Sequence, residues 1–234
     1  MFDSLLADAQ RGERQFTVYR AGEETDIEVQ FEAYDIDVVH GELPPGGPDP
    51  FLVIEEHGEF AGAIALEELE VLLEPPIVRP GDREDVSPGY SVLFDVLDET
   101  VFTAMERRQL LAVSREIEDR AYRVGTGTLR VSFQTLSTFE SQAPVYRRLA
   151  AETDLDIHIY GVDDWTPPEI AGITYHEVAA DTLGRYWVLA FDGGSDEMQA
   201  CGLVAQERTE GYDGVWTDDP EMVGEILREL EATP

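Results

Sequence analysis

The chain has 234 residues, of which 43% are hydrophobic, so it can form one large domain or two small ones around a real core. It contains 50 acidic residues, 16 arginines and no lysine, which gives a formal net charge of −34 at pH 7. This charge excludes direct nucleic-acid binding, which needs basic residues to neutralise phosphates, and no apolar run is long enough to cross a bilayer.

The acidic residues are spread over nearly every segment, including those with an apolar helical face, and this pattern disfavours a disordered acidic tail. At about 1 M salt the Debye length falls to about 3 Å, and repulsion between distant charges is screened. Met1-Phe2-Asp3-Ser4 lacks the layout of a signal peptide. The sequence therefore predicts a halophilic, cytoplasmic protein; a calcium-storing or basic-partner-binding protein would gather its acids in clusters.

In the N-terminal third, apolar spacing predicts a helix around Leu5 to Ala9, then strands at 16–19 and 36–40. A Pro- and Gly-rich stretch follows at 44–50, and strands at 51–55 and 60–65 flank a turn, as in a hairpin. Residues 66–73 are typical of a short amphipathic helix that Pro75 and Pro76 end.

After the Pro- and Gly-rich segment 77–89 and a short helix at 92–97, the pattern predicts the longest helix at 105–124, which Gly125 caps. The expected order is then strand 128–133, helix 140–151, strands 157–160, 173–178, 186–191 and 200–206, and helix 220–230. Helices alternate with strands, so we predict an α/β fold with a mixed β-sheet and flanking helices; α+β is the alternative.

We expect an N-terminal α/β half at 1–76, a linker with a short helix at 77–100, and a C-terminal α/β half at 101–234, which could also pack as one domain. The order helix, strand, strand, hairpin, helix occurs in both halves. This echo suggests a pseudo-two-fold repeat in which the 105–124 helix is an insertion.

The sequence has no phosphate-binding loop, no Gly-x-Ser-x-Gly elbow and no His-Glu-x-x-His, so no catalytic residue is assigned and no cofactor is expected. Cys201 is the only cysteine and is expected to be a buried strand residue. The four histidines are far apart in the sequence and lack the spacing of metal ligands, so they are interpreted as structural and no metal site is predicted.

Eight of the sixteen arginines lie between Arg107 and Arg148. Salt bridges within the helix account for some of them, because Glu116 to Arg120 and Asp119 to Arg123 have the favoured spacing of four. The other interpretation is an electropositive pocket in which arginine binds a carboxylate or phosphate. Helix pairing is the more frequent of the two.

Aromatic residues gather towards the C-terminus, and most of them should pack in the core. Trp165 follows a predicted strand in a Pro-rich loop, where ligands of α/β sheets bind. The candidate ligand-binding residues are Arg107, Arg108, Arg115, Gln134, Trp165 and Trp216.

The run Arg107 to Glu118, followed by Gly127-Thr128-Leu129, resembles the DICT sensory domain. Further stretches agree with stand-alone members from salt-loving archaea, in order 133–134, 145–149, 158–161, 164–165, 201–203 and 214–220. The family accompanies diguanylate cyclases and two-component systems, so the resemblance implies a sensory or regulatory module in signal transduction. It supplies no binding residues, and no kinase, cyclase or DNA-binding segment accompanies the region.

The sequence thus favours a non-enzymatic cytoplasmic sensor that binds a small, anionic ligand and acts through a signalling partner. One alternative is an enzyme with an unrecognised carboxylate or histidine site. The other is a ligand-free adaptor for a kinase or transcription regulator. A homodimer formed through the long helix is compatible with signalling, and neither nucleic acid nor membrane is an expected partner.

Overall fold

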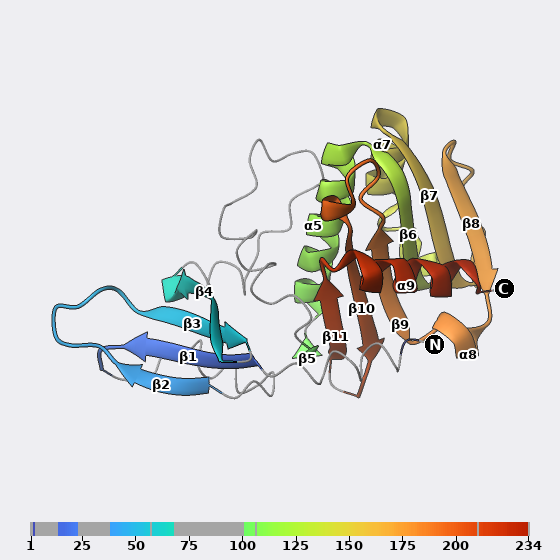
Figure 1. The fold of residues 1–234 in the computed structure, drawn as a ribbon. Helices are drawn as coiled ribbons and strands as arrows, with labels where there is room; N and C mark the ends of the chain where they lie inside the picture. Colours follow the sequence, from blue (N-terminus) through green and yellow to red (C-terminus); the bar gives the residue numbers. More distant parts are fainter. Residues whose placement is uncertain are drawn as a thin grey trace.

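The computed structural model describes residues 2, 14–22, 38–56, 58–67, 101–105, 107–209 and 211–233. These residues form two β-sheets with flanking helices, which confirms the predicted α/β class (Figure 1). The helices expected near Leu5 and at 92–97 lie outside the described residues, as do the segment 77–100 and the helix expected at 66–73 beyond Glu67. The predicted division into two halves and a linker therefore stays a prediction.

The small sheet contains β1 (Arg14–Arg20), β2 (Val38–Glu42), β3 (Phe51–Glu56) and β4 (Glu59–Ala65) in the order β2-β1-β3-β4. β1 is parallel to β2 and antiparallel to β3, and β3 and β4 form the expected hairpin. Phe16 and Val18 alternate with more polar residues and are buried together with Leu52 and Ile54. The small sheet therefore buries one apolar set of side chains, as a period of two predicts.

The large sheet has the order β5-β11-β10-β9-β6-β7-β8. Its strands are β5 (Val101–Met105), β6 (Thr126–Thr135), β7 (Asp154–Val162), β8 (Ile173–Val178), β9 (Tyr186–Phe191), β10 (Cys201–Glu207) and β11 (Tyr212–Thr217). β6, β7 and β8 are parallel neighbours, and every other pair is antiparallel. Among the described strands, β8 lies at the edge of this sheet and pairs with β7 alone.

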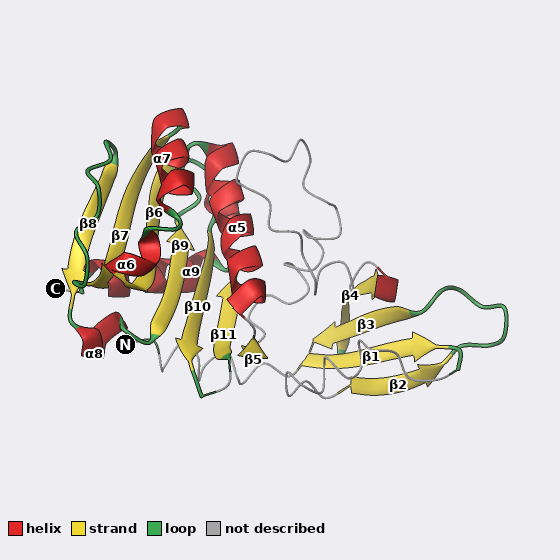
Figure 2. Cartoon of the chain, turned by 180° about the vertical axis from the view of Figure 1, so that it is seen from behind, coloured by secondary structure: helices red, strands yellow, loops and turns green. Residues whose placement is uncertain are grey.

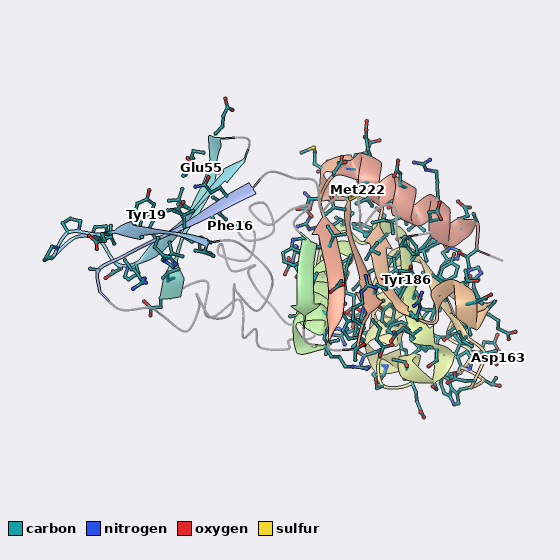
Figure 3. All side chains as sticks on the ribbon, turned by 90° about the horizontal axis from the view of Figure 1, so that it is seen from below. Phe16, Tyr19, Glu55, Asp163, Tyr186 and Met222 are labelled. Atoms are coloured by element: carbon teal, nitrogen blue, oxygen red, sulfur yellow. The ribbon has the colours of Figure 1, made fainter. Side chains whose placement is uncertain are left out.

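Helices cover both faces of the large sheet. In Figure 2, α5 (Arg107–Val124), α6 (Leu136–Phe139) and α7 (Ala143–Glu152) lie in front of the strands. On the opposite face lies α9 (Pro220–Glu231), and α8 (Ala180–Leu183) and the 3₁₀ turn η1 (Glu197–Gln199) join strands. Figure 3 shows α9, which carries Met222, from a third direction, with Tyr186 on β9 and Asp163 beyond the end of β7.

Alternating side chains of the central strands divide the core into two layers. Leu129 and Val131 of β6 and Leu189 of β9 are buried on the α5 face, whereas Val188 and Ala190 are buried on the α9 face. Because both faces are covered, all six residues of β9 are buried. A strand buried on both sides has the near-continuous apolar sequence that β9 shows.

The two sheets show a related strand order. The small sheet has β2-β1-β3-β4, and the large sheet contains β8-β7-β6-β9-β10, which matches it once β6 is taken as an inserted strand. In both series the first two strands are parallel and the last two form an antiparallel pair. In the sequence, the 105–124 helix was expected to be an insertion between the two repeats. β6 directly follows this helix in the chain. The pseudo-two-fold repeat itself stays a prediction.

Two strands of the large sheet were not predicted. β5 lies just before α5, and β11 lies between the predicted strand 200–206 and the predicted helix 220–230, where no element was expected. β11 includes Asp213 and Gly214, two residue types that are depleted in strands, so pairing with β10 rather than local propensity makes it a strand. Among the described residues, no helix is both long and apolar enough to cross a membrane.

Candidate functional site

The long helix α5 lies across β6, β9 and β10 and positions most of the candidate residues. Leu110, Ile117 and Ala121 form its buried stripe. Gly125 ends it with a φ of 72°, and its N–H donates to the Ala121 carbonyl at 2.8 Å, as expected for a left-handed C-cap. The helix thus begins near the carboxyl end of β6 and ends near the start of that strand.

Arg107, the first residue of α5, lies over two aromatic rings. Its guanidinium carbon is 5.5 Å from the centroid of the Trp187 ring, and its side chain also forms a hydrogen bond with Tyr212. The Trp187 and Tyr212 rings meet edge to face with centroids 6.2 Å apart. Arg107 remains exposed although both rings are buried, so its outer side faces solvent.

Hydrogen bonds to α5 hold the ring of Trp187 in place. Its Nε1–H donates to the Ser114 hydroxyl oxygen at 3.1 Å, and that hydroxyl donates to the Leu110 carbonyl at 2.8 Å. Ser114 is buried, so both polar groups are satisfied inside the core. This chain of hydrogen bonds fixes the surface on which Arg107 rests.

Gln134 lies at the same edge with unusual backbone geometry. It is the one non-glycine residue of the described part with a positive φ, at 65°, and the β6–β7 pairing shifts register between Ser132 and Thr135. Its Nε2 donates to Glu207 Oε2 at 3.2 Å. Left-handed geometry in a non-glycine residue stores local strain, which occurs most often at binding sites. We call Arg107, Gln134, Trp187, Glu207 and Tyr212 the Arg107 cluster.

The electrostatics of the Arg107 cluster combine both signs. Burial raises the pKa of Tyr212, the nearby Glu207 carboxylate raises it further, and the charge and hydrogen bond of Arg107 lower it. Tyr212 is therefore a neutral phenol at neutral pH. The cluster offers a guanidinium, a phenol and a side-chain amide beside one carboxylate.

The end of β7 contributes a second set of residues at this edge of the sheet. Asp164 accepts hydrogen bonds from the Ser137 backbone N–H at 2.8 Å and from its hydroxyl at 2.5 Å. These bonds lower the pKa of the Asp164 carboxyl. At Gly161 a Cβ would lie 2.8 Å from the Leu136 backbone nitrogen, so the approach of β7 to the start of α6 requires glycine. Trp165 is partly buried and packs against the core instead of standing free.

Arg115 lies two turns further along α5 and belongs to a different group. It donates to Glu118 and to the Gln142 amide oxygen of the residue before α7, and Glu118 accepts from the Tyr146 hydroxyl at 2.5 Å. The side chain of Glu118 is only 3% exposed. Burial raises its pKa, while Arg115 and Tyr146 lower it. We call Arg115, Glu118, Gln142 and Tyr146 the Glu118 cluster; it joins α5 to α7.

The second half of α5 pairs with the start of α9. Arg120 donates to Asp218 at 3.0 Å, and Arg123 donates to Asp119 and lies 3.6 Å from Glu116. The spacing of four between Asp119 and Arg123 is thus used as predicted. Arg120 is hydrogen-bonded across the fold to Asp218, and the Glu116 carboxylate also raises its pKa. Tertiary contact decides this partner, because Asp218 follows β11 directly beneath α5.

Cys201 is buried at the start of β10, as expected. Burial raises the pKa of its thiol to about 12, so the thiol stays protonated at neutral pH. It is a small apolar core residue in the layer that α5 covers.

Of the six residues predicted to bind a ligand, Arg107, Gln134 and Trp165 lie at the edge formed by the carboxyl ends of β6 and β7. Arg115 is held in the Glu118 cluster. Trp216 lies opposite Leu203 in the core, towards the other end of β11 from Tyr212. The side chain of Arg108 lies outside the described residues.

Sequence reasoning missed the two rings beneath Arg107. Trp187 and Tyr212 belong to the C-terminal aromatic group, but nothing in their local sequence distinguishes them from core aromatics. Their placement depends on the antiparallel pairing of β10 with β9 and β11, which brings Ala205 beside Trp187 and Gly214. Among the eight arginines, salt bridges with carboxylates involve Arg115, Arg120, Arg123, Arg130 and Arg148. Arg107 lies over the Trp187 ring, and the anion-binding pocket stays a prediction.

Two of the histidines, which are far apart in the sequence, meet in the structure. His158 and His176, which are 18 residues apart, lie side by side on β7 and β8 with ring nitrogens 2.9 Å apart. Sequence distance concealed this pairing, because parallel strands join residues across an intervening loop. Among the described residues, no three His, Cys, Asp or Glu side chains form a group that could hold a metal ion.

Comparison with known proteins identifies one family. The profile of DICT, the sensory domain in diguanylate cyclases and two-component systems, matches residues 91–208, which include α5 and the strands from β6 to β10. No curated protein matches the chain. Among solved structures, a polyphosphate kinase from Porphyromonas gingivalis is similar over 97% of this chain and 47% of its own, with 14% identity and a TM-score of 0.38. The chain thus spans about half the length of that kinase, and so distant a likeness carries no argument.

Proposed function

Because this chain belongs to the DICT family of sensory domains, we propose that it is a cytoplasmic sensor whose Arg107 cluster binds a small anionic ligand and which signals through a partner protein. The observation that carries the proposal is Arg107 itself. It is exposed, yet contacts with Trp187 and Tyr212 hold it in place.

A pre-positioned arginine favours binding because little side-chain freedom remains to be lost. The guanidinium presents several N–H donors in one plane and can donate two parallel hydrogen bonds to a carboxylate or phosphate. Resting one face on Trp187 leaves the rim of the guanidinium available for such bonds. Carboxylate or phosphate is therefore the ligand chemistry that fits.

The place of the cluster in the fold supports the same proposal. Ligands of open α/β sheets bind beyond the carboxyl ends of parallel strands, and Gln134 lies at that end of β6. Next to β6 is β9, which runs in the opposite direction, so the parallel part of the sheet ends here. The strained backbone of Gln134 adds a second sign of function at this edge.

High salt affects which contacts can contribute to recognition of an anionic ligand. With a Debye length of about 3 Å at 1 M salt, attraction at a distance is weak, and only groups in direct contact discriminate between ligands. A guanidinium fixed on an aromatic ring provides such a contact.

The ligand would reach the rest of the molecule through α5. Arg107 begins this helix, Arg115 ties it to α7, and Arg120 ties it to the segment before α9. Binding at the first residue of α5 could therefore alter both helical layers through direct contacts. A partner protein would read that change.

Mass spectrometry of small molecules released from purified protein tests the ligand proposal. The protein would be purified and denatured at high salt, in its natural form and as the variants Arg107→Ala and Arg147→Ala. Arg147 is a matched control, because it is an exposed arginine on α7 away from the Arg107 cluster. We expect an anionic compound to be retained by the natural protein and by Arg147→Ala and to be lost from Arg107→Ala.

A second measurement uses inorganic phosphate and citrate as probes of the two anion classes, with thermal unfolding as the readout. Ligands that bind only the folded state raise the melting temperature with concentration. Equal stabilisation of the natural protein and Arg107→Ala by both probes, together with no compound released from either, would refute binding at this cluster.

A further inference from the structure

On the α9 face, two histidines form a contact that the proposed ligand site does not use. His158 Nδ1 and His176 Nε2 are 2.9 Å apart, and the other ring nitrogen of His158 lies 3.0 Å from Asp156 Oδ2. His176 stacks on the ring of Tyr160 with centroids 4.3 Å apart. The parallel register, which places Tyr160 beside His176, creates this row.

The row is surrounded by charged groups from each neighbouring element. β6 contributes Arg130, which donates to the Tyr160 hydroxyl, and α9 contributes Glu231, 3.6 Å from Arg130. β7 contributes Asp156 and Tyr160 in addition to His158. The row thus extends from edge strand β8 to the C-terminal end of α9.

The contact between the two rings depends on how many protons the pair carries. The hydrogen bond between the two rings needs one nitrogen with a proton and one without. With no added charge, His158 donates to Asp156 through Nε2 and accepts from His176 through Nδ1. When one proton is added, the ring pair carries one positive charge and the hydrogen bond between the rings is kept.

A second proton cannot be added without breaking the contact. Both facing nitrogens would then carry hydrogens, and two imidazolium rings would meet at hydrogen-bond distance. Asp156 contacts the ring of His158, whereas Arg130 places a further positive charge near His176. Burial, His158 and Arg130 all lower the pKa of His176, in agreement with this geometry.

We propose that His158 and His176 form a pH-responsive latch, which holds β8 and the end of α9 on the sheet and opens when the second proton binds. Opening separates His176 from His158 and from the Tyr160 ring on which it stacks. Among the strands that the structure describes, β8 pairs with β7 alone, so loss of this side-chain contact weakens the edge of the described sheet. Arg130 transmits the change to Glu231, because it contacts both Tyr160 and Glu231.

The latch can respond within the range of pH that cells experience. Histidine is the side chain whose ordinary pKa lies between about pH 5 and 8. His158 keeps 15% of its side chain exposed, so protons can reach the row from solvent. The latch is on the opposite face from the Arg107 cluster and does not depend on ligand binding there.

Hydrogen exchange of the full chain at high salt tests the latch. Exchange of the β8 amides (173–178) and of the last turn of α9 would be compared at about pH 7.5 and about pH 5, after correction for intrinsic rates. We expect protection in both segments to fall on acidification, because the second proton breaks the contact between the rings, while β9 amides keep theirs.

The variant His176→Gln keeps a polar side chain but cannot take up the proton, so its β8 protection should not change between the two pH values. The matched control His40→Gln replaces an exposed histidine on β2 and should keep the full response of the natural protein. NMR titration of the natural protein provides a readout that no variant can disturb: the ring signals of His158 and His176 should titrate as a coupled pair in two separate steps.

The proposal is wrong if β8 protection in the natural protein is the same at both pH values. It is equally wrong if His176→Gln retains the acid response, or if the two rings titrate independently. An unfolded His176→Gln variant would leave the exchange and NMR results of the natural protein to decide.

Discussion

On the α5 face of the large sheet, Arg115, Arg120 and Arg123 pair with carboxylates, whereas the α9 face gathers a pair of histidines beside one arginine. Arg115 and Arg120 keep their charge at any physiological pH, so their contacts connect α5 to α7 and α9 permanently. Histidine, in contrast, is the side chain type whose charge can change within the physiological pH range. One sheet can therefore carry a permanent set of polar contacts on one face and a titratable set on the other, because an apolar layer of side chains separates each set from the opposite face.

Removing salt should have the largest effect, because it acts on the surface that surrounds both faces. With a net charge of −34, lengthening the Debye length from about 3 Å at 1 M to about 30 Å at 0.01 M restores repulsion across the whole chain. We expect the protein to unfold at low salt, as followed by circular dichroism. Full native ellipticity at 0.01 M salt would contradict the halophilic adaptation that the composition predicts.

Breaking the fixed framework should have the next largest effect. Glu118→Ala leaves Arg115, whose side chain is 11% exposed, without its carboxylate, and it removes the acceptor of the Tyr146 hydroxyl. Removing one partner of a buried ion pair costs about 3–5 kcal/mol. Denaturant unfolding at high salt measures this loss of free energy of unfolding.

The double variant Arg115→Met/Glu118→Leu is the control for that experiment. It removes both charges and fills the space with apolar side chains, so it should recover most of the lost stability. If the double variant is as unstable as Glu118→Ala, packing rather than the unpaired charge would be responsible.

Glycine substitutions on the two faces should differ in sign. At Gly161 a new Cβ would meet backbone atoms of Thr135 and Leu136 at 2.9 and 2.8 Å, so Gly161→Ala should cost about 1–3 kcal/mol. At Gly224, within α9, a new Cβ has no neighbour within 4 Å, and Gly224→Ala should stabilise the helix by about 0.5–1 kcal/mol. Thermal unfolding of both variants checks the contrast, and equal effects of the two substitutions would show that the close approach at Gly161 is not rigid.

Changes in pH should have the smallest effect on stability, after salt removal, Glu118→Ala and the glycine substitutions. The contributions of the two faces should change in opposite directions. The folded pKa of His176 lies below its ordinary 6.5, so the unfolded state binds more protons and stability falls as pH drops below about 6.5. The folded pKa of Glu118 lies above its ordinary 4.5, so the folded state binds more protons and stability falls as pH rises above about 4.5. His176→Gln should remove the first trend and Glu118→Gln the second in denaturant unfolding measured across this range.

Much of the C-terminal fold could be predicted from the sequence. The apolar stripe and Gly125 located α5 to within two residues, and β8 and β9 were predicted with the bounds that the structure shows. These elements have strong local signals: a helical period with a cap, and short runs of β-branched and aromatic residues between turns. β5, β11 and the short α6 were missed because their pairing or capping depends on distant residues, as for α6, whose first turn is held by Asp164.

The candidate site was predicted only in part. Arg107, Gln134 and Trp165 were selected from the sequence and lie at one edge of the sheet, but the rings beneath Arg107 were not selected. Trp216 was selected and is a core residue on β11. Residue type indicates which side chains can bind an anion, but burial and strand register decide which of them face solvent.

Composition alone determined the charge and the absence of lysine, and periodicity determined the α/β class, the long helix and the central strands, because these depend on local spacing. The family followed from short motifs read in order. Only the tertiary structure decided that Arg120 pairs with Asp218, that Arg107 rests on Trp187, and that His158 meets His176. Each of these contacts joins residues from different elements, and strand order and register, which place elements side by side, arise from packing of the whole core.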